Sequence, residues 1–390
     1  MMVFLPRGFR MNSDDWEVLL MKKSFPMKLL CALILFSLLC PAAALGEKRI
    51  VKVSCTGDTL LGCSEYVRKN GAGSYSFDTY IDKYGYAYPF AGLYDMFSKD
   101  DITFVNLECV LADDIKKGFS KSHYIFRAPT DYAKILTEGS VEVVNLANNH
   151  TENYGNEGIE KTVAALEAEG IGYCGTTFGL NSYWIADLGE IKIGFVGAYP
   201  RYNGGDASKK VKHQKELESC FDACKEAGCQ VIIAAIHAGG EYQPKSANLQ
   251  WGYENLCIKF GADLVIGNHP HIPQGLKVEN GVTSLHSIGN FVFGGNTGVK
   301  EIKENLRLPG YVAQFDLVFE DNVYTGHQLT IWPIHISGTY PENNYQPVLV
   351  SGDDAEEVMK MIQNDTNITL NPYVEGKGAV QEFVPAPEKK

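Results

Sequence analysis

Short apolar runs rich in β-forming residues alternate with helix-like stretches from residue 50 onward, and this alternation limits the possible folds more than any other feature of the chain. The pattern is typical of βαβ units, in which helices pack against a sheet of mainly parallel strands. We expect strands at residues 50–54, 102–105, 141–146, 191–196, 231–236, 264–266, 283–287 and 312–317. We expect helices at residues 158–169, 215–227 and 355–363. The sequence therefore predicts a layered α/β fold.

The 390 residues are enough for two average domains or for one α/β domain with a broad sheet. We expect one such domain over residues 45–335, followed by a C-terminal extension, residues 336–390, that packs on the domain or trails from it. Residues 65–88 and 200–213 are expected to be long surface loops, which often surround a functional site.

An export signal is expected near the N-terminus. Lys22 and Lys23 begin a basic stretch, an apolar run follows at residues 29–39, and three alanines end at Ala44. This order predicts a signal peptide over residues 21–44, and residues 1–20 before it indicate a mis-assigned start. The apolar run is shorter than the roughly 20 residues that a membrane-spanning helix needs. A poor lipidation context argues against a lipid anchor on Cys40, so we expect an extracytoplasmic, secreted or envelope-associated protein.

Removal of residues 1–44 leaves 30 basic and 44 acidic residues, a formal balance of −14. This acidity argues against nucleic acid as a partner. Eight of the ten cysteines remain, and an even number in an exported protein permits disulfides whose pairing the sequence does not give. The spacing of Cys220, Cys224 and Cys229 does not match structural zinc sites, so we interpret these residues as buried or helical thiols.

Polar residues that are able to bind metals stand directly after the predicted strands. In an open α/β sheet, the loops that follow parallel strands meet at one edge. The candidates are Asp58, Glu108, Asn149, His150, His237, His269 and His271. A single Asp or His in such a place is usually structural, since it caps a helix or satisfies a loop. Their joint occurrence after five strands favours a shared metal site.

The mixture of ligands favours a transition metal. Carboxylate and amide oxygens combined with imidazole nitrogens suit Zn²⁺, Mn²⁺ or Fe²⁺ better than Ca²⁺, which prefers oxygen alone. The most specific local element is His269-Pro270-His271, because proline stiffens a turn in which two imidazoles approach neighbouring metal positions. We expect one or two divalent ions.

Three residues have open interpretations. His150, in the loop before the helix expected at 158–169, is placed to meet a negatively charged reacting group. Arg127 either binds an anionic substrate or forms a surface salt bridge. Asn290 follows Gly289 after a predicted strand, and we interpret it as structural or as a support behind the metal ligands.

These motifs resemble, in order and spacing, those of the CapA family of poly-γ-glutamate capsule synthesis proteins, which belongs to the calcineurin-like metallophosphoesterase superfamily. The resemblance runs from about residue 50 to residue 333. It is carried by Thr56-Gly57-Asp58, Val105-Asn106-Leu107-Glu108, Phe126-Arg127-Ala128-Pro129, Ala147-Asn148-Asn149-His150, His237 through Tyr242, Gly267 through His271, and Ser287 through Phe293.

The resemblance implies a four-layer α/β/β/α sandwich. It implies that Asp58 and His271 hold one metal position, that Glu108 bridges to a second, and that Asn149, His237 and His269 hold that second position. It also implies that His150 protonates the leaving group or stabilises charge on the transferring group. Glu241 is implied to orient His237.

The sequence departs from the superfamily pattern at several positions. No histidine follows Asp58 closely, where typical dinuclear phosphoesterases supply another ligand, and Glu108 replaces their usual bridging Asp. Within the CapA-like pattern, Ala238 stands where an aromatic residue is common, Asn153 where Asp is common and Asn268 where His is common.

The leading functional hypothesis is an exported, metal-dependent hydrolase or transferase of capsule or poly-γ-glutamate biosynthesis. It would act on an anionic cell-surface polymer or its precursor, in contact with a capsule synthesis membrane complex. The alternative is a non-catalytic export or anchoring component that keeps a degenerate metal cleft. A third reading, a carbohydrate- or peptide-binding surface module, rests on the tyrosines near residues 75–94.

Overall fold

The computed structural model describes residues 47–64, 67, 76–115, 124–175, 183–200, 207–296 and 308–388. The expected mis-assigned start, the signal peptide and Cys40 lie outside the described residues, as do parts of the two expected surface loops. Within the described part of the chain, no helix has the length and apolar character that crossing a membrane requires. The unit Lys48–Lys390 contains the whole fold that follows.

The larger sheet has ten strands among the described residues, and β1 (Lys48–Leu60) lies at its centre. On one side of β1 run three parallel strands: β3 (Ile102–Leu107), β6 (Val143–Asn145) and β7 (Gly172–Cys174). On the other side run two long antiparallel strands, β15 (Pro309–Glu320) and β16 (Val323–His335). Short strands complete this sheet: β14 (Asn290–Phe293) beside β1, and β17 (Val348–Leu349), β18 (Ala379–Val380) and β19 (Val384–Pro385) beside β16.

The second sheet has six strands in the described residues, in the order β12-β13-β11-β10-β9-β8. These are β8 (Tyr183–Asp187), β9 (Lys192–Ala198), β10 (Val231–His237), β11 (Leu264–Asn268), β12 (Leu276–Glu279) and β13 (Val282–Leu285). The four central strands are parallel, and β8 and β12 pair antiparallel at the edges. A small separate sheet joins β2 (Cys63–Ser64), β4 (Val110–Leu111) and β5 (Phe126–Ala128).

The two large sheets pack face to face over a shared apolar core. Val53 and Phe104 from the ten-stranded sheet belong to the same buried cluster as Phe195 and Ile233 from the six-stranded sheet. The Phe104 and Phe195 rings stack with centroids 5.5 Å apart. Because alternate side chains of a strand point to opposite faces, the remaining apolar residues of each sheet face outward and need a helical cover.

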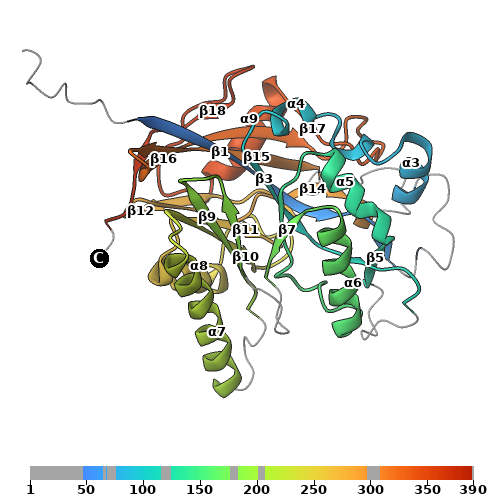
Figure 1. The fold of residues 1–390 in the computed structure, drawn as a ribbon. Helices are drawn as coiled ribbons and strands as arrows, with labels where there is room; N and C mark the ends of the chain where they lie inside the picture. Colours follow the sequence, from blue (N-terminus) through green and yellow to red (C-terminus); the bar gives the residue numbers. More distant parts are fainter. Residues whose placement is uncertain are drawn as a thin grey trace, which may run out of the picture. The chain divides into compact units, whose positions relative to one another are not determined.

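Helices supply that cover on both outer faces (Figure 1). The six-stranded sheet packs against α7 (Ala207–Glu226) and α8 (Asn248–Phe260). The ten-stranded sheet packs against α5 (Ala133–Glu138) and α6 (Gly155–Ala168), with α3 (Phe77–Tyr84), α4 (Tyr94–Phe97) and the short 3-10 turns η2 (Tyr88–Phe90) and η3 (Thr130–Tyr132) in the same cluster. A further turn, η4 (Gly294–Asn296), follows β14. The predicted four-layer α/β/β/α order is therefore confirmed.

The residues after 335 continue the ten-stranded sheet. The strands β17, β18 and β19 pair with β16, and α9 (Gly352–Gln363) buries Val358 and Ile362 in the core between the sheets. Burial of two aliphatic side chains contributes about 3–6 kcal/mol of hydrophobic stabilisation before the entropy cost of ordering the segment. The C-terminal segment therefore packs on the fold as one of its structural elements.

Several expected elements have different limits in the structure. The strand expected at 50–54 extends to Leu60, so Asp58 lies inside β1 and not after it, at a break in register that follows Cys55. The surface loop expected over 200–213 is wrong from Ala207 onward, because α7 begins there. The loop expected over 65–88 contains the helix α3.

Candidate metal centre

The predicted ligands come from strands of both sheets. Asp58 lies near the end of β1, Glu108 directly follows β3, and Asn149 stands in the loop after β6. His237 is the last residue of β10, and His269 directly follows β11. The strands β1, β3 and β6 are parallel within one sheet, and β10 and β11 are parallel within the other. Their carboxyl ends therefore deliver these side chains to a common edge of the sandwich.

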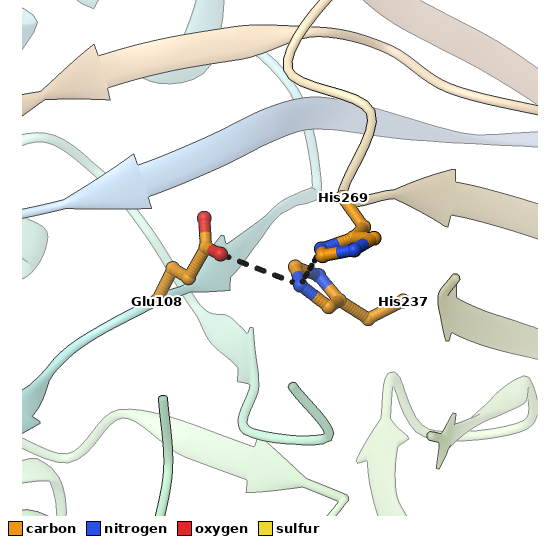
Figure 2. A group of neighbouring side chains, drawn as sticks. All are labelled: Glu108, His237 and His269. Carbon is orange, nitrogen blue, oxygen red and sulfur yellow. Dashed lines mark hydrogen bonds and ion pairs between the residues drawn. The ribbon is translucent and has the colours of Figure 1, made fainter. Parts of the chain in front are cut away.

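Glu108, His237 and His269 form the first of two groups whose ligand atoms lie within 4.8 Å of one another. Figure 2 shows the Glu108 carboxylate directed at the His237 ring, with the His269 ring beside it. The Nε2 atom of His237 is 3.3 Å from Glu108 Oε1, 3.0 Å from His269 Nδ1 and 2.8 Å from Asn149 Oδ1. Four electron-pair donors from four chain segments therefore converge on one point.

Asp58, Glu108 and His271 form the second group within the same 4.8 Å limit. The Nδ1 atom of His271 is 3.1 Å from Asp58 Oδ2 and 2.9 Å from Asn290 Oδ1. Glu108 belongs to both groups, so its two carboxylate oxygens lie between two sets of donors. This is the relation expected of a ligand that bridges two neighbouring metal positions.

The hydrogen bonding of the described residues shows that these donors fit a divalent metal ion. Both carboxylate oxygens of Glu108 are fully buried and accept no hydrogen bond within the described chain. A single buried polar group without a hydrogen-bond partner normally costs about 1–3 kcal/mol. His237 Nε2 and His269 Nδ1 share at most one proton. At least one of the acceptors around His237 Nε2 therefore faces another lone pair. A cation satisfies all of these atoms at once, whereas hydrogen bonds do not.

His237 and His269 are poised as neutral ligands. Burial, opposed in part by the charge of Asp58 and reinforced by His271, lowers the pKa of His237 to about 4. Burial and the charges of His237 and His271 lower the pKa of His269 to about 3. Metal binding requires an unprotonated imidazole nitrogen, so both rings are ready for a metal ion at neutral pH.

The second group, which consists of Asp58, Glu108 and His271, instead holds a proton. Burial alone would lower the pKa of His271, but the charge of Glu108 and the hydrogen bond and charge of Asp58 raise it to about 9. Burial would raise the pKa of Asp58, but the hydrogen bond and charge of His271 lower it. Burial, followed by the charge of Asp58, raises the pKa of Glu108 to about 8. The group therefore keeps positive charge on His271 until another cation replaces it.

His150 lies at the edge of the two groups. Its Nε2 atom is 3.9 Å from Glu108 Oε1, and its Nδ1 atom is 3.0 Å from Asn153 Oδ1. Because Asn153 Oδ1 also accepts a hydrogen bond from the Phe126 backbone N–H, at 2.9 Å, that oxygen is an acceptor and His150 carries a proton on Nδ1. Nε2 is then the atom that exchanges a proton with a bound group. Burial, opposed by Glu108 and Asn153, lowers the pKa of His150.

The backbone at two of the predicted ligands is strained. His269 has φ of 101° and His271 has φ of 60°, a region that residues other than glycine rarely occupy. The backbone N–H of His269 donates to Asp58 Oδ2, at 3.2 Å, which helps to hold this conformation. Such strain persists where surrounding contacts determine the geometry, and it is commonly found at functional sites.

Arg127 and Glu241 do not belong to either group. The Arg127 guanidinium donates to the carbonyl of Ala112, at 2.8 Å, from strand β5. Glu241 is exposed, and the Nδ1 atom of His237 has Asn106 Nδ2 as a neighbour at 3.2 Å. Asn290, in contrast, contacts His271 directly. The roles expected for all three residues stay predictions.

Sequence reasoning missed two asparagines beneath the site. The backbone N–H of Ala147 donates to Asn145 Oδ1, Asn145 Nδ2 donates to Asn106 Oδ1, and Asn106 Nδ2 donates to Asp58 Oδ1. Asp58, Asn106 and Asn145 are register partners on β1, β3 and β6, so they form a row across three strands. The available signal was an asparagine in each of two neighbouring, mainly apolar strands.

Comparison with known proteins gives a family match over most of the described fold. The family model described as "Bacterial capsule synthesis protein PGA_cap" matches residues 52–295. This range includes every residue of the two donor groups and also His150.

Two curated relatives are similar at the sequence level. A capsule biosynthesis protein CapA of Bacillus anthracis is 24% identical over 228 residues, 55% of this chain and 55% of that protein. A PGA biosynthesis protein CapA of Bacillus subtilis is 27% identical over 173 residues, 41% of this chain and 44% of that protein. The chain thus spans about half the length of these relatives.

Among solved structures, a phosphatase from Mycoplasma pneumoniae is similar over 74% of this chain and 95% of that chain, with a TM-score of 0.41 and 14% identity. A likeness at this level says nothing about the chemistry of the site.

Proposed function

The chain belongs to the bacterial capsule synthesis protein family, and from that premise we propose that it is an exported protein of capsule or poly-γ-glutamate biosynthesis that acts as a metal-dependent hydrolase or transferase. The observation that carries the proposal is the buried carboxylate of Glu108, which has no hydrogen-bond donor among the described residues and lies between two groups of metal-capable side chains. The curated relatives carry names in capsule and PGA biosynthesis, which supports the choice of process.

The residues of the centre divide into two ligand sets. Asp58 and His271 would hold one ion, Asn149, His237 and His269 would hold the other, and Glu108, which belongs to both groups, would contribute to both positions. A bound divalent ion would act as a Lewis acid, activating water and stabilising negative charge on the reacting group. Once ionised, the buried carboxylates would repel an anionic substrate, so we expect such a substrate to bind only when cations are present.

His150 is the proton donor for the leaving group in this proposal. Its Nδ1–H is held by Asn153, so the ring presents Nε2 toward Glu108 and the donor groups. The Phe126 and His150 ring centroids lie 4.6 Å apart with the rings edge to face, so Phe126 is one of the residues that pack against the imidazole. Because its pKa is lowered, His150 is ready to accept a proton in the free protein. A bound anionic group would raise that pKa, so that the protonated ring could act as the acid that donates to the leaving group.

The substrate and the location complete the proposal. The substrate is an anionic cell-surface polymer or its precursor, and the site of action is outside the cytoplasmic membrane, in contact with a capsule synthesis complex. The signal-like segment over residues 21–44 supports export.

The proposal is tested with purified protein and a panel of phosphoester and γ-glutamyl substrates. We expect turnover that depends on a divalent metal and falls at least about 100-fold in the His150→Ala variant, the range typical for loss of a proton-transfer group. His335→Ala is the matched control, because His335 is a half-buried histidine of β16 outside the centre. Equal turnover in wild type, chelated protein and His150→Ala would reject the mechanism.

The second candidate is a non-catalytic export or anchoring component. Its support is the segment after Asp58, where the buried Leu60 and Leu61 stand in place of a further histidine ligand. Under this alternative, a producing strain with His150→Ala keeps its surface polymer, whereas deletion of the protein abolishes it. Loss of polymer in both strains favours chemistry.

A further inference from the structure

The two predicted metal positions have unequal sets of assigned ligands. The position of His237 and His269 has four donors, which are those two imidazoles, Asn149 and the shared Glu108. The position of His271 has three, which are His271, Asp58 and Glu108. Transition-metal ions usually take four or more ligands, so the second set lacks one protein donor. The residue in the best place to supply it is Asn290.

The backbone carries Asn290 to Asp58. Strand β14 runs parallel to β1 with Asp58 and Asn290 as register partners, so both side chains point to the same face of the sheet. The N–H of Asp58 donates to the carbonyl of Gly289, at 2.9 Å. A Cβ atom at Gly57 would lie 1.9 Å from that carbonyl oxygen, so the approach of the two strands depends on glycine at position 57.

The distances around His271 match a coordination shell. Asn290 Oδ1 is 2.9 Å and Asp58 Oδ2 is 3.1 Å from His271 Nδ1. Two donors that each lie about 2.1 Å from one ion, at angles near 90–110°, are about 3.0–3.4 Å apart. The Asp58 oxygen, at 3.1 Å, is within this range and the Asn290 oxygen, at 2.9 Å, is just below it, so both are close to the separation that ligands of a shared ion would have.

The same arrangement occurs at the other position. There, Asn149 Oδ1 lies 2.8 Å from His237 Nε2, and the resemblance assigns Asn149 as a ligand. Asn290 thus stands to His271 as Asn149 stands to His237, with Glu108 shared between the two pairs. Asn290 is fully buried, and its Nδ2 has no hydrogen-bond partner within the described residues, so only its oxygen is engaged.

We propose that Asn290 Oδ1 is a metal ligand and completes the position held by Asp58, Glu108 and His271, in place of the histidine that typical dinuclear phosphoesterases supply after the first Asp. This inference rests on the proposed metal centre. The competing role is positional: Asn290 would accept the Nδ1–H of His271 and never touch an ion.

Diffraction from crystals of the full chain soaked with Mn²⁺, at the manganese absorption edge, separates the two roles. We expect an ion within about 2.3 Å of Asn290 Oδ1. An ion at the His271 position with that oxygen more than about 3 Å away would show the positional role and overturn the inference.

Titration with Mn²⁺ gives an independent readout. We expect two equivalents in the wild type, about 100-fold weaker binding at one position in Asn290→Ala, and retained binding in Asn290→Asp, since second-layer residues alone change affinity by about 10–100-fold. Asn343→Ala is the matched control, a buried asparagine whose Nδ2 also lacks a partner among the described residues. Unchanged binding in Asn290→Ala overturns the inference alone, whereas a wild type that binds no Mn²⁺ overturns the proposed metal centre as well.

Discussion

Nδ2 of Asn106 donates a hydrogen bond of 2.8 Å to Oδ1 of Asp58, and this bond determines which oxygen of Asp58 faces the candidate metal centre. With Oδ1 engaged, Oδ2 points to His271 Nδ1 and accepts from the backbone of His269. Asn145 fixes the orientation of Asn106 in turn, and the backbone of Ala147 fixes Asn145. The centre therefore rests on a row of buried amides.

Replacing Asn145 by Ala is expected to weaken this support. The change leaves Asn106 Oδ1 and the Ala147 N–H without their partners, so the free energy of unfolding should fall by about 1–3 kcal/mol. Metal affinity should also fall, by about tenfold, because the orientation of Asp58 is no longer fixed. Urea unfolding and Mn²⁺ titration measure the two effects. The exposed Asn364→Ala variant serves as control, and an equal loss in both variants would contradict this role.

Glu108→Gln is expected to stabilise the metal-free protein while it abolishes bridging. A buried carboxylate without a donor is costly, and an amide removes the charge, so the variant should gain about 1–3 kcal/mol. The folded-state pKa of Glu108 is raised from 4.5 to about 8, so the folded protein binds more protons in that interval and loses stability as pH rises through it. Thermal unfolding of chelated protein between pH 4.5 and 8 should show this decline in wild type and a shallower one in the variant.

Metal uptake is expected to release protons from His271 and Glu108 at neutral pH. The pKa of His271 is raised to about 9, so the ring is protonated at pH 7 and must lose that proton to bind an ion. Glu108, whose pKa is raised to about 8, must also lose its proton, so below about pH 8 the apparent affinity at this position should rise by up to about 100-fold per pH unit. Calorimetry in two buffers of different ionisation enthalpy counts the protons released. A constant affinity between pH 6 and 8 would be inconsistent with a protonated His271.

Asn153→Asp is expected to raise the pKa of His150. The new carboxylate would accept the same two hydrogen bonds, from His150 Nδ1 and the Phe126 N–H, and would add a negative charge beside the ring. The imidazole resonances of His150, identified by their absence in His150→Ala, report the shift by NMR. A pKa that stays the same or falls would show that Asn153 does not set the charge of His150.

The convergence of the donors was predictable because it depends on topology. Asp58, Glu108 and His237 each lie at or just after a parallel strand, and parallel strands of one sheet end at a common edge. The sequence pattern therefore placed Asp58 with Glu108 at the edge of one sheet, and the layer order that the resemblance implied brought His237 to them from the other sheet. The layered arrangement followed from the same alternation of strands and helices, and the resemblance supplied the layer order.

The contacts beneath and beside the centre were not predictable, since they depend on strand register. Asn106 and Asn145 meet only because β1, β3 and β6 align them with Asp58. Thr162, a polar residue of α6, is buried, and its hydroxyl accepts a hydrogen bond from the Leu111 N–H. The helix α8 was also missed, because its buried positions include the polar Gln250 and Glu254, which obscure an apolar stripe.

Elemental analysis of the purified protein, after chelation, reloading with Mn²⁺ and removal of excess ion, tests the central claim most directly. We expect two equivalents of metal in the wild type, no more than one in His237→Ala and in His271→Ala, and the largest loss in Glu108→Ala, since Glu108 belongs to both donor groups. A wild-type chain that retains no divalent metal, or three variants that retain as much as the wild type, would contradict a metal centre at this site.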